Sequence, residues 1–159
     1  RSHGISFNKS YWHKEAGFNF RMTNLQAAMG VAQMGRIKDL VGQRKKIFNY
    51  YDLKLKNCKK ISLLPSNNWS ENSYWLYTIT INNIGEKKRD KILVNLLKKG
   101  IETKPVFYPL NRMKPYKKYS KGSYNISNYL SANSLSLPSS KINRNAQDYI
   151  IESLIKEIN

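Results

Sequence analysis

The sequence predicts an α+β fold, in which helices cover a small sheet and one long helix forms a spine. Three observations support this prediction. Apolar residues recur at close to a helical period of about 3.6 from residue 24 to residue 57. The stretch YWLYTITIN, residues 74–82, alternates apolar and polar positions as a half-buried strand does. Two further stretches, which begin near residues 86 and 143, carry the apolar stripe of an amphipathic helix.

The spine helix is predicted over residues 24–57, with Thr23 and Asn24 at its N-cap. Its first half, LQAAMGVAQMG, is rich in small residues, and both flanks of that half are apolar. Small side chains let another backbone come close, so we expect this half to be covered on more than one side. Residues 1–23 show no sustained period and predict an irregular arm. The expected division is therefore an arm, residues 1–23, and a domain, residues 24–159.

The remaining elements follow from periodicity and from helix and strand breakers. EKKRDKILVNLLKKG predicts a helix whose stripe ends at Gly100. IETKPVFY predicts a second strand, which should lie at an edge or end early because Pro105 has no N–H to donate. YNISNYLSANSL predicts a short helix, LSLPSS a short extended segment, and the last helix begins near Asn143. Three sets of residues share a side within the predicted elements: Trp75, Tyr77, Ile79 and Ile81 on the strand at 74–82, Ile92, Leu93, Leu96 and Leu97 in the stripe of the first of these helices, and Ala146, Ile150, Leu154 and Ile158 at a spacing of four in the last helix.

The charge is strongly positive, with 28 Lys and Arg against 10 Asp and Glu and a net charge of +18. One interpretation is a footprint for nucleic acid, for which the basic and aromatic run KPYKKYSKGSY at 114–124 would supply lysines and stacking rings. Another is a lysine-rich composition with no specific polyanion partner, which we favour because the lysines are scattered and outnumber the arginines. A third is that the chain is part of a larger protein whose other part is more acidic.

Several classes of site have no support in the sequence. Cys58 is the only cysteine, and with His3 and His13 as its possible partners it makes a poor zinc set, so we expect no metal site. The glycine-rich phosphate loops and the G-x-S-x-G and H-E-x-x-H motifs are absent. No apolar run approaches the roughly 20 residues that span a membrane, which predicts a soluble, cytoplasmic protein without membrane contact.

The stretch GFNFRM, residues 17–22, stands directly before the spine helix. Gly17 permits a turn, and alternation would direct Phe18 and Phe20 into a core while Asn19 points the other way. An amide at such a place can donate to an anion or cap a backbone group. From the residues alone, Asn19 and Arg21 could equally serve to tie down an irregular arm.

Several stretches taken in series carry a family resemblance. They are HG at residues 3 and 4, YWHKEAGFNFRMTNLQAAMGVAQM at 11–34, QRKKIFNYY at 43–51, GIETKPVFYPLNRMKPY at 100–116 and LSLPSS at 135–140. In this order they resemble the C-terminal part of the DegT/DnrJ/EryC1/StrS nucleotide-sugar aminotransferases, with the perosamine synthetase branch most similar. The most specific piece is G-[FY]-N-[FY]-R-M running into an alanine-rich helix, and the resemblance covers nearly the whole chain.

The resemblance implies the small-domain portion of an aspartate-aminotransferase-type fold, which depends on pyridoxal 5'-phosphate. In the family a large domain binds the cofactor and carries the lysine that forms the Schiff base, and no lysine here stands in the matching context. We therefore expect no catalytic residue in this chain and no transamination by it alone. The expected partners are that large domain, a second subunit in a homodimer and a nucleotide-sugar substrate, with no specific nucleic acid. A regulatory relative without the chemistry is also compatible with the sequence.

The resemblance also assigns roles to individual residues. Asn19 would reach across the dimer interface to the cofactor phosphate of the neighbouring subunit, with Arg21 bracing the arm and His13 in a structural role. Phe107, Tyr108 and Asn111 match a loop over the sugar-nucleotide side of the pocket, where the family commonly has a histidine at the position of Asn111. An asparagine can still hydrogen-bond there but cannot titrate near neutrality. The small-residue face of the spine helix would pack against the large domain, so we expect the chain made alone to associate with itself or with that missing domain.

Overall fold

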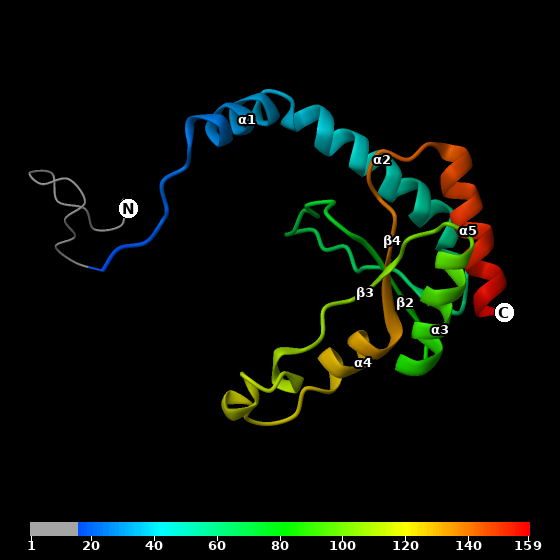
Figure 1. Ribbon diagram of the computed structural model, residues 1–159. Coiled ribbons are helices and arrows are strands. Elements are labelled where there is room, and N and C mark those ends of the chain that lie inside the picture. The colour runs from blue at the N-terminus through cyan, green and yellow to red at the C-terminus, as the bar shows by residue number, and fades with distance from the viewer. Residues whose placement is uncertain (1–15) are drawn as a thin grey trace, which may run out of the picture. The chain divides into compact units, whose positions relative to one another are not determined.

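The computed structural model describes residues 16–159 and divides the chain into two compact units, Arg1–Leu40 and Val41–Asn159 (Figure 1). The expectations that concern His3, Gly4 and His13 lie outside the described residues. Among the residues described, no helix is long and apolar enough to cross a membrane, and no group of three or more potential metal ligands occurs.

The first unit contains helix α1, Asn24–Met34, preceded by an extended stretch from residue 16. Thr23 is its N-cap and forms a capping box with Gln26. The Thr23 hydroxyl accepts from the Gln26 N–H at 3.3 Å, and the Gln26 side chain accepts from the Thr23 N–H at 2.9 Å. Two otherwise unpaired amides at the start of the helix are thereby satisfied, which fixes where α1 begins.

The prediction of one uninterrupted spine helix is wrong. The segment forms α1 and a second helix α2, Ile37–Leu55, with a turn at Gly35 and Arg36 between them. Gly35 keeps right-handed helical angles, but the Arg36 N–H donates to the carbonyl of Gln33, three residues back, at 3.0 Å. Glycine has low helix propensity, and such tighter bonding is common where a helix ends. Apolar periodicity continues through the turn and does not reveal it.

Four short strands form one antiparallel sheet in the order β1-β2-β4-β3. Their bounds are Ile61–Ser62 for β1, Tyr77–Ile81 for β2, Lys104–Pro105 for β3 and Ser134–Leu137 for β4. The predicted edge position of the strand with Pro105 is confirmed, since β3 lies at the end of the sheet. Strand β2 begins later than expected, because Tyr74 has a left-handed φ of 53° and Trp75 is 62% exposed.

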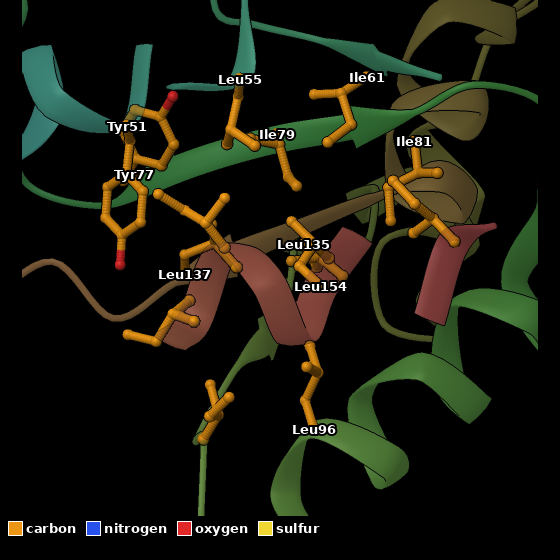
Figure 2. Close-up of a cluster of buried hydrophobic side chains, with 14 of the residues drawn as sticks. Tyr51, Leu55, Ile61, Tyr77, Ile79, Ile81, Leu96, Leu135, Leu137 and Leu154 are labelled. Atoms are coloured by element: carbon orange, nitrogen blue, oxygen red, sulfur yellow. The ribbon is translucent and has the colours of Figure 1, made fainter. Parts of the chain in front are cut away.

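Helices α2, α3 (Gly85–Lys98) and α5 (Arg144–Ile158) contribute the side chains that pack on one face of this sheet (Figures 1 and 2). The alternation predicted for β2 is confirmed at Tyr77, Ile79 and Ile81, which are all buried. Gly100, with φ of +74°, follows the end of α3 as expected. The stripe predicted for α3 holds only in part, because Leu97 is 62% exposed. The fully covered members of the core include Tyr51, Leu55, Ile79, Ile81, Leu96, Leu135 and Leu154.

The other face of the central strands is polar. Thr78 on β2 lies 3.0 Å from Ser136 on β4, and Thr80 lies 2.8 Å from Ser134, hydroxyl to hydroxyl. Helix α4, Asn125–Asn133, leads directly into β4. Helix α3 contacts both α4 and β3, so these three elements lie close together.

Candidate functional site

The segment 106–113 leaves the sheet edge after β3 and carries the loop residues that the sequence singled out. Its last backbone bond to the sheet is the Val106 N–H to the Ser134 carbonyl at 3.5 Å. A short 3-10 turn, Leu110–Arg112, then closes the loop, and the Arg112 N–H donates to the Pro109 carbonyl at 3.0 Å. Residues 107–112 are called the substrate loop below, after the role that the family resemblance implies for them.

Phe107 and Tyr108 are both solvent-accessible, with 73% and 41% of their surfaces exposed. The Phe107 ring lies 6.2 Å from the Trp75 ring, centre to centre, at a tilt of 31°. Two large aromatic faces are therefore open to solvent side by side beyond the start of β2 and the end of β3. Such faces can stack on a planar or sugar ligand.

Tyr108 lies against two arginines. The guanidinium carbons of Arg89 and Arg112 are each 5.9 Å from the centre of its ring, within the range of cation–π attraction. Glu86 joins both cations, with its carboxylate 3.2 Å from Arg112 and 3.7 Å from Arg89. The side chain of Tyr108 is thereby linked to helix α3.

Arg89 itself has no exposed surface. Its Nε donates to Asp90 Oδ1 at 2.8 Å, and Nη1 donates to the Ser131 carbonyl at the end of α4. Nη2 lies 2.7 Å from the same Asp90 oxygen but makes no well-aligned hydrogen bond. A buried cation is tolerated where carboxylates and carbonyls surround it, as they do here.

Asn111 lines a pocket of about 440 Å³ on the outer side of the substrate loop. Its other lining residues include three tyrosines, Tyr116, Tyr119 and Tyr124. The sequence from residue 103 to residue 147 contains no carboxylate, while it contains eight lysines and arginines. Aromatic rings, an amide and a local excess of positive charge suit an anionic ligand that has a planar group.

Asn19 lies in the other unit, in the stretch before α1, and is exposed. The Phe18 and Phe20 rings stack at 5.1 Å and remain 67% and 77% exposed, so the expectation that they point into a core is wrong. Residues two apart in an extended chain share a side, which allows the two rings to pair with each other. The neutral amide of Asn19 is a suitable donor for a phosphate oxygen on another polypeptide.

Phe107, Tyr108 and Asn111 lie in one loop, but neither Phe107 nor Tyr108 lines the pocket at Asn111. The structure also reveals Arg89, Glu86 and Arg112, which the sequence analysis did not identify. A signal for Arg89 was present. It lies three residues before Ile92 and seven before Leu96 and so belongs to the buried stripe of α3. A charged residue on an apolar stripe indicates a buried ion pair.

Comparison with known sequences gives a consistent set of similarities. The DegT/DnrJ/EryC1/StrS aminotransferase family matches residues 1–155. A GDP-perosamine synthase from Caulobacter vibrioides is 32% identical over 139 residues, which is 87% of this chain and 38% of that protein. A GDP-perosamine synthase from Escherichia coli O157:H7 is 31% identical over 156 residues, which is 97% of this chain and 41% of that protein. The chain thus spans about two fifths of the length of these relatives.

Solved structures give the same result. The PLP form of the putative sugar aminotransferase Spr1654 from Streptococcus pneumoniae matches 99% of this chain and 41% of its own, with a TM-score of 0.86 and 25% identity. Helicobacter pylori PseC, an aminotransferase of pseudoaminic acid biosynthesis, matches with a TM-score of 0.85 at 23% identity and shares the fold.

Proposed function

Because the chain belongs to the DegT/DnrJ/EryC1/StrS aminotransferase family, we propose that it is the C-terminal part of a pyridoxal-phosphate-dependent sugar aminotransferase. The substrate is a nucleotide-linked keto-deoxysugar, and an amino acid such as glutamate donates the amino group. The observation that carries the proposal is the family match over residues 1–155. Relatives named GDP-perosamine synthase, at 31–32% identity, support perosamine-type sugar biosynthesis as the setting.

Pyridoxal phosphate supplies the electron sink for amino-group transfer when it is bound. In our proposal a larger cofactor domain holds it, and residues of this chain complete the pocket. Asn19 fits the role of phosphate contact, since its exposed amide can donate to an anion without adding a charge. The assembled enzyme would be a homodimer in which the arm of one subunit reaches the cofactor of the other.

The substrate loop would bind the sugar nucleotide. The exposed rings of Phe107 and Tyr108 provide stacking surfaces, and Asn111 provides an amide at the tyrosine-lined pocket. Lys118, whose Nζ lies 4.9 Å from the centre of the Tyr119 ring at that pocket, would lower the cost of bringing a diphosphate to the surface. In these roles the residues bind and orient the substrate, and the chain alone does not carry the reaction.

The test combines this chain with a family cofactor domain, pyridoxal phosphate, glutamate and a nucleotide-linked keto-deoxysugar. We expect amino sugar to form only in the complete mixture, as followed by mass spectrometry. Absence of product in the complete mixture, with the cofactor demonstrably bound, would overturn the assignment as an aminotransferase part.

Asn19→Ala tests the cofactor contact in the same assembly. Loss of one hydrogen bond to a charged phosphate is expected to weaken cofactor binding by about tenfold, as measured by equilibrium dialysis. Gln33→Ala removes another exposed amide from the same unit and is the matched control. Equal cofactor affinity in the two variants would exclude a phosphate contact by Asn19.

A further inference from the structure

We propose that Arg89 and Glu86 of helix α3 hold the substrate loop in place through Tyr108 and Arg112, which makes Arg89 a positioning residue. The importance of this arrangement for binding rests on the proposed function, in which the substrate loop contacts the sugar nucleotide. The arrangement itself rests on contacts within the second unit and can be measured without any substrate.

Arg89 is the central residue of this arrangement. Its guanidinium is wholly covered, and it joins three segments: Asp90 on its own helix, the Ser131 carbonyl on α4, and the ring of Tyr108 in the loop. Burying a charge is unfavourable, and an apolar residue would serve packing alone as well or better. A covered arginine with partners on three segments instead fixes their relative positions.

The carboxylate of Glu86 is shared between the two arginines. Glu86 lies between Arg89 and Arg112, so its negative charge offsets both cations that face Tyr108. Its side chain is 35% exposed and that of Arg112 is 43% exposed, whereas that of Arg89 has no exposed surface. The cluster therefore has a rigid inner end at Arg89 and an accessible outer end at Arg112, where a ligand could reach it.

Apart from the ring contact of Phe107 with Trp75, the loop has few contacts with the sheet and helices outside α3. Among the described residues, the side chains of Tyr108 and Arg112 have no hydrogen bond or ion pair apart from the Arg112–Glu86 contact. The backbone bonds in the loop are local, from Arg112 to Pro109 and from Met113 to Leu110. Local turns of this kind open readily unless side chains anchor them. The contacts with α3 supply that anchor.

Amide hydrogen exchange of the 159-residue chain tests the proposal. Glu86→Gln keeps the shape of the side chain but removes its charge, which leaves both arginines facing Tyr108 with less compensation. We expect the Arg112 and Met113 amides to exchange about threefold faster, with the β2 amides unchanged. Glu152→Gln, an exposed carboxylate on α5, is the matched control and should leave the loop amides unaffected.

Two further variants separate positioning from general stability. In an Arg112→Met background, Glu86→Gln should produce a smaller additional acceleration, because the ion pair between Glu86 and the loop is already gone and only its contact with Arg89 remains. Arg89→Met should accelerate loop exchange by about tenfold, whereas the exposed Lys88→Met should not.

The proposal is overturned if Glu86→Gln leaves the loop amides unchanged, or if it accelerates β2 and the loop equally. It is also overturned if its effect persists undiminished without Arg112. None of these results depends on aminotransfer. Failure of the reconstituted reaction would count against the proposed function and leave the measured anchoring of the loop intact.

Discussion

Helices α1 and α5 have similar lengths but different surroundings. Helix α5 buries six of its residues, including Ile150, Leu154 and Ile158, in the core of the second unit. Helix α1 buries none, although Leu25, Met29 and Val31 are as apolar as the residues that α5 buries. The apolar stripe of α5 is therefore buried within its own unit. The apolar residues of α1, as the chain stands, face solvent, which is typical of a surface made for a partner.

The two helices are therefore expected to differ in role, with α5 contributing to the stability of its unit and α1 to association with a partner. The buried cluster belongs to the second unit and holds its helices on the sheet. In the first unit the described residues up to 39 are all exposed, and its helix depends on local bonds such as the Thr23 capping box. Isolated helices of this length are marginal in water, so α1 gains little from propensity alone. We expect substitutions in the two helices to affect different measurements.

The largest expected effect is on the core. Leu154→Ala removes a side chain with no exposed surface and should lower the free energy of unfolding by about 2–5 kcal/mol, in urea titrations followed by circular dichroism. Met29→Ala in α1, where 63% of the residue's surface is exposed, should change the free energy of unfolding by less than about 0.5 kcal/mol. Comparable losses in the two variants would show that α1 is part of the same cooperative core.

The next effect concerns association. Leu25→Lys combined with Met29→Lys places charges on the apolar side of α1, and we expect it to raise the dissociation constant of self-association at least about tenfold. Analytical ultracentrifugation of the chain over a concentration series measures this. Leu53→Lys changes another exposed leucine, in α2, and should leave the association unchanged. A monomeric parent chain, or equal effects at both places, would contradict a partner surface on α1.

The elements that could be predicted from sequence are those in which periodicity and burial agree. The alternation around Ile79 predicts the β2 face because one side of that strand packs on helices. Gly100 marks the end of α3 because the chain there needs a positive φ that glycine adopts easily. Pro105 predicts an edge strand because it cannot donate to a neighbour.

What could not be predicted depends on contacts between distant residues. The turn at Gly35 interrupts hydrogen bonding but not apolar spacing, so periodicity continued through it. Strand β1 has two residues, too few for any alternating pattern, and exists through its pairing with β2. Trp75 was expected to share a face with Tyr77 and Ile79 but is 62% exposed, because the left-handed Tyr74 directly precedes it and the strand begins only at Tyr77.

The candidate site shows the same division. The sequence placed Phe107, Tyr108 and Asn111 on one loop through their adjacency in a recognisable stretch. It did not connect that loop to Arg89, which is 19 residues away from Tyr108 and meets it only through the packing of α3 against α4 and β3. The role of Asn19 stays a prediction, since it concerns a ligand on another polypeptide.

The smallest expected effect is a dependence of stability on pH, and it concerns helix α5. Hydrogen bonds from Lys99 and from Asn95 hold the pKa of Glu157 below its usual range and join α3 to α5. Because the pKa is lower in the folded state, the unfolded chain binds more protons as the pH falls. The stabilisation is therefore complete above the ordinary carboxyl pKa and is lost as the pH drops through the folded value.

Glu157→Gln should accordingly reduce the free energy of unfolding at pH 7 by no more than about 1 kcal/mol, because Lys99 is partly exposed and solvent screens the pair. The gap between parent and variant should narrow as the pH of the urea titrations is lowered from the ordinary glutamate pKa of about 4.3 through the lower pKa of Glu157 in the folded state. Glu152→Gln, at an exposed position on the same helix, should show no such gap at neutral or acidic pH. A gap that persists in acid would mean that Glu157 stabilises the helix pair through its shape and not through its charge.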